Sequence, residues 1–117
     1  MKTFLLSTIT VCALVTACHQ PAGKVLGKAP SGNARTVLAI LAGDTPATVT
    51  LSGAMTEKCP VAGCWFKLSD NTGTIKVDTQ SAGFVVADLP LETRMTVSGK
   101  IVQSGDEIVI EASGVRY

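Results

Sequence analysis

The sequence is poor in the residues from which most active sites are built. Among its 117 residues it has one histidine, His19, and one tryptophan, Trp65. It contains no Gly-rich phosphate loop, no G-x-S-x-G nucleophile motif and no internal repeat. Without a second histidine, a buried acid pair or a serine beside a base, nothing assembles a hydrolytic site. We therefore expect a protein that is not an enzyme.

An excess of charge of either sign is also missing. Ten Lys and Arg residues stand against nine Asp and Glu residues. Lys2 lies in the N-terminal segment that we expect to be removed, and its loss leaves nine basic against nine acidic residues. Proteins that bind nucleic acids neutralise phosphates with a basic stripe. No such stripe is visible, so we expect no nucleic-acid partner.

No apolar run is long enough to cross a bilayer, which takes roughly 20 residues. The longest runs from Phe4 to Ala17 and follows Lys2. A basic residue before a short apolar run is typical of a secretory signal peptide. We predict a signal peptide over residues 1–17.

The end of this run, "VTAC" from Val15 to Cys18, resembles the lipobox of bacterial lipoproteins. The resemblance implies cleavage before Cys18 and a diacylglyceryl group on its sulfur, which anchors the chain in a membrane. His19 follows where an inner-membrane retention signal usually has Asp, which favours the outer membrane. The expected location is the bacterial cell envelope, facing the periplasm.

Residues 18–34 are rich in Gly, Pro, Ala and polar side chains and have no apolar period. They are predicted to form a lipidated flexible tether, followed by a folded domain over residues 35–117. A short helix is expected at the start of this domain, around Val37 to Leu41. Asn33 or Ser31 is its expected N-cap, and Gly43 its expected end.

From Ala47 onward, apolar residues alternate with polar ones, as in half-buried β-strands. Phe84 and Leu89 lie in an irregular connection and are expected to plug the core. The expected fold is all-β: a five-stranded, OB-fold-like Greek-key barrel with a short N-terminal helix. A six-stranded sandwich or another small barrel is the competing topology. The expected strands lie at residues 47–55, 64–69, 74–79, 94–102 and 107–112.

Two cysteines remain in the domain, because Cys12 is removed with the signal peptide and Cys18 carries the lipid. They lie in "CPVAGCW", Cys59 to Trp65, at the mouth of a predicted hairpin. An even pair in an exported protein usually forms a disulfide. We predict a Cys59–Cys64 disulfide.

Two alternatives use the same pair. A redox site needs a thiol with a lowered pKa, for which neighbouring Lys58 is a candidate cause. A metal site is only half supplied for zinc, whereas Cu(I) accepts two thiolates, with Met55 as a further soft ligand nearby in sequence. Apart from this Cu(I) alternative, no cofactor or metal is expected.

Trp65 and Lys67 are the candidate ligand surface. Strand alternation places them on the face opposite Cys64, Phe66 and Leu68, which makes it the outer face if those three point to the core. OB-folds bind ligands on this strand. An exposed Trp65 could stack on a sugar, a base or a peptide. The alternative is that Trp65 covers the disulfide or a gap under the N-terminal segment.

The run from Val49 to Val77, together with "GFVV" and "TVSGKIV", resembles a group of small exported bacterial OB-fold domains of unknown function. The match covers residues 47–115 and centres on the C-x-x-x-G-C-W motif of Cys59, Gly63, Cys64 and Trp65. The resemblance implies the fold and no defined activity. Phe66 stands where these proteins often have Met, which removes one soft metal ligand.

The predicted function is a non-catalytic, lipid-anchored OB-fold module of the cell envelope. Its partner would be an envelope protein, a peptidoglycan-like molecule or a small ligand. The alternative is an envelope thiol-redox or copper-handling protein that uses Cys59 and Cys64.

Overall fold

A computed structural model describes residues 23–117. The predicted signal peptide, the lipidation site Cys18 and His19 lie outside these residues. Within residues 23–117, no helix has the length and apolar character needed to cross a membrane.

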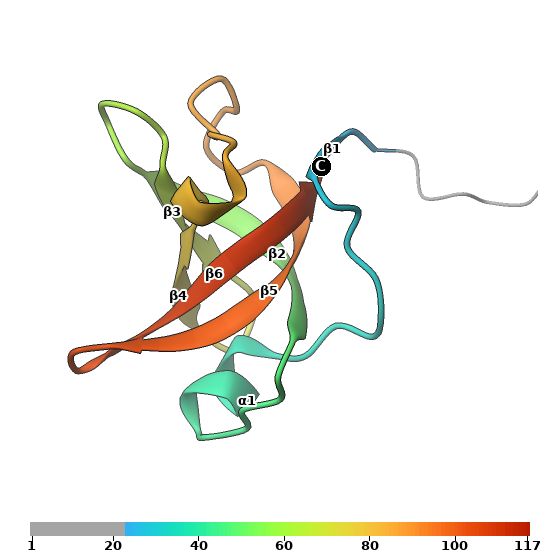
Figure 1. Cartoon of the computed structure of the whole chain (residues 1–117), viewed down its shortest axis with the longest axis vertical. Helices are drawn as coiled ribbons and strands as arrows, with labels where there is room; N and C mark the ends of the chain where they lie inside the picture. Colours follow the sequence, from blue (N-terminus) through green and yellow to red (C-terminus); the bar gives the residue numbers. More distant parts are fainter. Residues whose placement is uncertain (1–22) are drawn as a thin grey trace, which may run out of the picture.

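Five strands form a closed barrel (Figure 1). β2 pairs with both β3 and β5, β3 pairs with β4, β4 runs parallel to β6, and β6 pairs back to β5. Every barrel strand therefore has two neighbours and no edge is left open. This is the order of an OB-fold-like barrel, as predicted. The strands are β2 (Val49–Lys58), β3 (Trp65–Ser69), β4 (Thr74–Asp78), β5 (Arg94–Ser104) and β6 (Glu107–Arg116).

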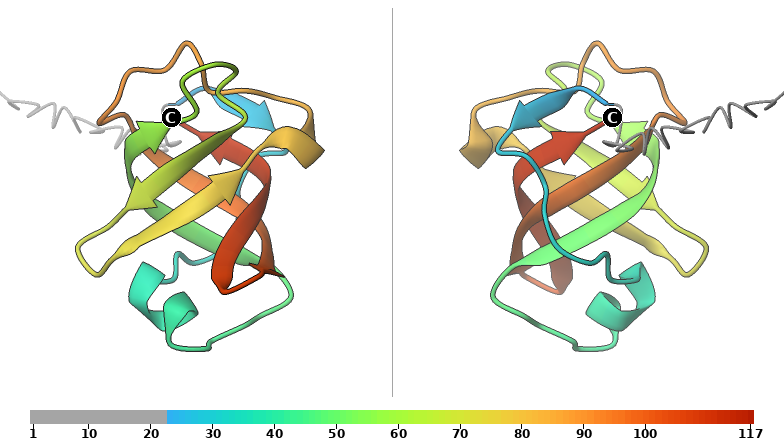
Figure 2. Two further views of the ribbon diagram at one scale, coloured as in Figure 1. Left: turned by 90° about the vertical axis from the view of Figure 1, so that its left-hand side faces the viewer. Right: turned by 90° about the vertical axis from the view of Figure 1, so that its right-hand side faces the viewer.

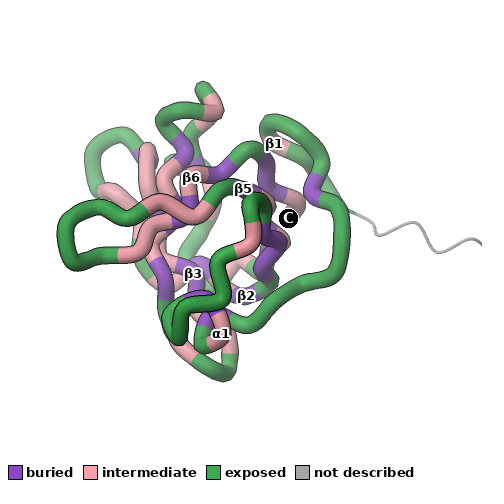
Figure 3. Tube along the Cα trace, turned by 60° about the horizontal axis from the view of Figure 1, so that its bottom comes forward, coloured by how far each residue is buried: buried purple, intermediate pink, exposed green. Residues whose placement is uncertain are grey.

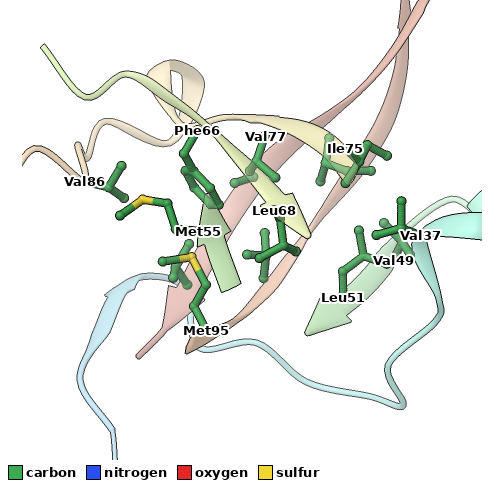
Figure 4. Packing of buried hydrophobic residues seen from close by; sticks show 14 of the residues in the cluster. Val37, Val49, Leu51, Met55, Phe66, Leu68, Ile75, Val77, Val86 and Met95 are labelled. Carbon is green, nitrogen blue, oxygen red and sulfur yellow. The ribbon is translucent and has the colours of Figure 1, made fainter. Parts of the chain in front are cut away.

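Alternating side chains fill the barrel, as the period of two in the sequence requires. In β3, Phe66 and Leu68 are fully buried, while Trp65, Lys67 and Ser69 lie half-buried on the outside. Figure 4 shows how the side chains of the core meet inside the barrel. The buried hydrophobic residues are Val37, Ile40, Val49, Leu51, Met55, Phe66, Leu68, Ile75, Val77, Val86, Met95, Val97, Ile110, Ala112 and Val115.

One end of the barrel is covered by α1 (Val37–Leu41), the predicted short helix (Figure 2). Its N-cap is Thr36, whose hydroxyl accepts a hydrogen bond from the amide of Ala39 at 3.2 Å. The predicted caps Asn33 and Ser31 are wrong. The helix starts where Val37 and Ile40, three residues apart, can both enter the core, and Thr36 is the polar residue directly before them.

The turn between β3 and β4 holds α1 in place through Asp70. Its Oδ2 accepts a hydrogen bond from the amide of Val37 at 2.9 Å. Its Oδ1 accepts from the amides of Thr72 at 2.7 Å and Gly73 at 3.1 Å. One carboxylate thus closes its own turn and caps a helix distant in sequence.

The segment before the helix differs from the flexible tether that the sequence suggests. Its described part, from residue 23, includes β1 (Val25–Gly27), which pairs antiparallel with β6. Pro30 is buried, and the hydroxyl of Thr50 donates a 2.6 Å hydrogen bond to the carbonyl of Ser31. Figure 3 shows that the segment is otherwise mostly exposed. The segment therefore runs along the barrel and is held to it by the pairing of β1 with β6 and by the hydrogen bond from Thr50 to Ser31.

The long connection from β4 to β5 begins with the 3-10 turn η1 (Gln80–Ala82) and then crosses the barrel end opposite α1 (Figure 2). Val86 is its fully buried residue. Phe84 and Leu89, the predicted plugs, are partly buried and pack against the core.

Candidate functional site

Cys59 and Cys64 lie at the two ends of the loop that joins β2 to β3, at the end of the barrel away from α1 (Figure 2). The amide of Gly63 donates to the carbonyl of Cys59 at 3.3 Å, which folds the loop into a single turn. The amide of Cys59 donates to the carbonyl of Trp65 at 3.0 Å. Cys59 and Cys64 thus stand at the two ends of one turn.

Gly63 fixes the loop against the β4–β5 connection. Its φ of 62° lies in the left-handed region that favours glycine. A Cβ at this position would lie 2.5 Å from the backbone nitrogen of Ala87. The amide of Val86 donates to the Gly63 carbonyl at 3.0 Å. The loop is therefore packed directly on residues 86–87.

Two further contacts hold the ends of the loop. The carbonyl of Cys64 accepts hydrogen bonds from both the amide and the hydroxyl of Thr79, each at 2.9 Å, and Thr79 is fully buried. The ammonium group of Lys58 donates to the carbonyls of Ala87 at 2.9 Å and Leu89 at 2.5 Å. Both cysteines thus sit on a backbone anchored from two sides.

Both cysteines are free and half-buried. Backbone hydrogen bonds from Ala62 and then Val61 lower the pKa of Cys59 to about 7, and the bond from Cys64 adds to them. The hydrogen bond to Cys59 raises the pKa of Cys64, followed by burial and the charge of Cys59. The pair is therefore polarised, and Cys59 is the thiol that ionises first.

The cause of this polarisation is not the one suggested by the sequence. Lys58 was the candidate, but its ammonium group bonds the carbonyls of Ala87 and Leu89. The amides of the turn itself stabilise the Cys59 thiolate. The side chains in the sequence do not indicate which main-chain amides stabilise a thiolate. Only the geometry of the turn shows this.

In the described part of the chain, no third His, Cys, Asp or Glu side chain joins the two cysteines as a metal ligand. Among residues 23–117, no three His, Cys, Asp or Glu side chains come together in a group that could hold a metal ion. Met55, the further soft ligand considered from the sequence, is fully buried and lies with Phe66 and Val86 in the core (Figure 4). The pair itself fits only a cation satisfied by two thiolates, such as Cu(I).

Trp65 begins β3 directly after Cys64 and lies half-buried on the outer face. The ammonium group of Lys76 sits 5.1 Å from the centroid of its ring, a cation–π contact. Lys67, the second predicted surface residue, forms an ion pair with Glu57 at 3.5 Å. Both predicted residues are thus on one face, each with a charged neighbour.

A groove of about 170 Å³ adjoins this face, and Lys76 belongs to both. Val102 and Val109 face each other across β5 and β6 and form its apolar part. Asp78, opposite Trp65 in the register, and Glu111 supply negative charge. The sequence does not indicate these groove residues, because β4, β5 and β6 become neighbours only when the barrel closes.

No protein-family model matches the chain, and no curated protein matches it. Among solved structures, it is similar to the hypothetical protein YgiW from E. coli, with a TM-score of 0.54 and 20% sequence identity. The similarity covers 75% of this chain and 94% of that chain. It supports the OB-fold-like barrel derived from the strand pairing.

Proposed function

We propose that the chain is a non-catalytic, lipid-anchored binding module of the bacterial cell envelope. It binds its ligand on the outer face of β3 and β4, and Cys59 and Cys64 close into a disulfide beside that face. The observation that carries the proposal is the half-buried Trp65 with Lys76 over its ring, on the strands that OB-folds use for ligands.

The chemistry of the face defines the ligand class. Trp65 offers an aromatic surface, and the adjacent groove offers Val102 and Val109 between charges of both signs. Such a surface suits a ligand with an apolar or sugar face and charged groups along its edge. Peptidoglycan fragments and extended peptide segments both have this composition.

The single turn between the two cysteines supports the disulfide, because it leaves Cys59 and Cys64 at its two ends. Closing the bond would lock the loop that leads directly into Trp65. The same placement favours a second candidate, binding of Cu(I) by the two thiolates.

Titration of the protein with soluble peptidoglycan fragments, and separately with a short peptide of mixed charge, tests the binding face. With one of them, NMR shifts should concentrate on β3, β4 and the groove, and the tryptophan emission should change saturably. Trp65→Ala should weaken binding at least about fivefold, since stacking of a base on an aromatic ring contributes about 1–3 kcal/mol and we expect a similar contribution here. Leu38→Ala is the matched control, because this side chain is exposed on α1, at the end of the barrel away from the β2–β3 loop.

Shifts that map elsewhere, or affinities that Trp65→Ala leaves unchanged, would contradict this face. The anchor is tested by cell fractionation: Cys18→Ala should move the chain from the membrane fraction to the soluble fraction. Retention of that variant in the membrane would contradict lipidation at Cys18.

A further inference from the structure

The outer face of β2, β5 and β6 carries a cavity separate from the groove beside Trp65. These strands are neighbours in the barrel (Figure 1), since β5 pairs with β2 on one side and with β6 on the other. The cavity has a volume of about 290 Å³ and shares no residue with that groove. Its polar lining residues are Ser52, Thr96, Tyr117, Arg94 and Arg116. Two cationic side chains and three hydroxyl-bearing side chains thus border one small space.

The strand register explains why these side chains come together. Thr96 lies opposite Ser52 in β2 and opposite Arg116 in β6, so one row of side chains crosses three strands. The hydroxyl groups of Ser52 and Thr96 are 3.0 Å apart and share a hydrogen bond. Arg94 lies two residues before Thr96 and therefore on the same face of β5.

Neither arginine of the cavity has an acidic partner in the described chain. Arg94 and Arg116 take no part in the ion pairs found among residues 23–117. Residues 1–22 contain no Asp or Glu that could supply a partner. The guanidinium group of Arg116 donates a hydrogen bond of 3.4 Å to the carbonyl of Pro30. Since a guanidinium group has five N–H donors, most of this capacity is left for a ligand.

The first described residues hold the stem of Arg116 in place. A Cβ at Gly23 would lie 2.9 Å from the Cγ of Arg116, so the main chain there packs directly on this side chain. Arg116 is accordingly half-buried. A donor that is ordered in advance loses less entropy when it binds a ligand. Arg116 is therefore pre-positioned to receive an anion.

A second cavity, of about 340 Å³, adjoins the first and shares Ser52, Gly53 and Arg94 with it. Apart from Ala54, the other residues that line it are polar or acidic: Thr56, Ser69, Asp70, Asn71 and Glu92. Acidic side chains repel a second anionic group, but they accept hydrogen bonds from hydroxyl groups. The two cavities together therefore suit a ligand with an anionic group at one end and hydroxyl groups at the other.

We propose that this face binds a phosphate monoester of a small hydroxylated molecule. Its phosphate lies between Arg94 and Arg116, and its hydroxylated part extends toward Glu92. Two guanidinium groups match the charge of about −2 on a phosphate monoester, and their forked donors suit its oxygens. Ser52 and Thr96 use one hydroxyl proton between them, which leaves the other for a further phosphate oxygen. A carboxylate, with one charge and two oxygens, would leave part of these donors unused.

NMR titration of the chain with glycerol 3-phosphate, at an ionic strength held constant with sodium chloride, tests the site. The shifts should saturate and concentrate on residues 52–54, 94–96 and 115–117. Arg94→Ala and Arg116→Ala should each weaken binding at least about tenfold, because each removes hydrogen bonds between charged groups. Arg116→Lys keeps the charge and should still weaken binding at least about threefold, since an ammonium group lacks the forked donors.

Lys100→Ala is the matched control for Arg94→Ala. Both residues are exposed on β5, and both substitutions remove one positive charge. Six residues of strand separate the two positions by about 20 Å, which exceeds the screening length of about 8 Å at physiological salt. The control should therefore leave the affinity within about twofold of the wild type. Circular dichroism confirms that each variant folds.

Two further probes define the ligand. Acetate should bind at least about tenfold more weakly than glycerol 3-phosphate, because it carries half the charge. Dihexanoyl phosphatidic acid, used below its micelle concentration, carries the phosphate on a glycerol without free hydroxyl groups. It should also bind more weakly, because the second cavity is polar. This comparison distinguishes a lipid headgroup from a free phosphate ester.

The outcomes that would overturn the proposal are distinct. Shifts that do not saturate, or an affinity that Arg94→Ala and Arg116→Ala both leave unchanged, would exclude the site. Equal binding of acetate would exclude a phosphate-specific site, and tighter binding of the phosphatidic acid would exclude the hydroxylated ligand. The inference goes beyond the proposed binding face, because Trp65 lies outside both cavities. Trp65→Ala should leave this affinity unchanged, so the two hypotheses fail separately.

Discussion

Single residues in the β2–β3 loop are fixed by contacts with the β4–β5 connection. Gly63 is the clearest case, because it combines a positive φ with a backbone neighbour where a side chain would begin. Gly83, in the same end of the barrel, also has a positive φ of 78° but has nothing within 4 Å of a Cβ position. Comparing substitutions at the two glycines therefore separates the cost of a left-handed backbone from the cost of a steric clash.

Gly63→Ala should lower the free energy of unfolding by about 3 kcal/mol or more. Left-handed backbone costs a non-glycine residue about 1–2 kcal/mol, and the displaced contact with Ala87 adds to it. Gly83→Ala should lose only the conformational part, about 1 kcal/mol. Urea denaturation measures both. Equal losses in the two variants would show that the packing on Ala87 contributes nothing.

The lowered pKa of Cys59 could not be predicted from the side chains in the sequence. The sequence identified the pair and its spacing, since Pro60 and Gly63 between two cysteines indicate a tight turn. The donors that lower the pKa of Cys59 are main-chain amides, which every residue carries. Their effect depends only on the direction that the turn gives them.

At the scale of elements, α1 depends on the barrel. A helix of five residues is not stable by itself in water. Val37 and Ile40 bury it from one side, and Asp70 in the β3–β4 turn binds its first amide. The sequence predicted the helix and the turn separately, but not the hydrogen bond between them, because 33 residues separate the two partners.

Asp70→Asn should destabilise the fold by about 1–2 kcal/mol at pH 7, since it weakens a helix cap and a turn together. Burial raises the pKa of Asp70, but hydrogen bonds from the Thr72 hydroxyl and the amides of Val37, Thr72 and Gly73 outweigh it, and the net pKa is lowered. A lowered pKa in the folded state stabilises at pH values above the unfolded pKa of about 3.9. This stabilisation is lost as the pH falls through the folded pKa.

Urea midpoints between pH 7 and pH 2.5 therefore test the assignment. The advantage of the wild type over Asp70→Asn should be constant near neutrality and should shrink below about pH 4. Asp106→Asn, in the exposed turn between β5 and β6, should stay within about 0.5 kcal/mol of the wild type. A wild-type advantage that does not change with pH would mean that the carboxylate charge is not involved.

At the scale of the whole molecule, the sequence predicted the five barrel strands because apolar and polar residues alternate along each of them. It missed β1, since three residues are too few to show a period. It also ended the last strand at Ala112, whereas β6 continues to Arg116. Ser113 and Gly114 interrupt the apolar pattern there, and the strand continues because β1 and β5 both pair with it.

The docking of β1 sets how the barrel would stand on a membrane. The described chain begins next to Tyr117, where the amide of Lys24 donates to the Tyr117 carbonyl at 2.7 Å. Figure 2 places this corner at the same end of the barrel as the β2–β3 loop. With the proposed anchor at Cys18, five residue steps to Gly23 reach at most about 18 Å. The end of the barrel that carries the β2–β3 loop would then lie close to the lipid surface, with α1 pointing away.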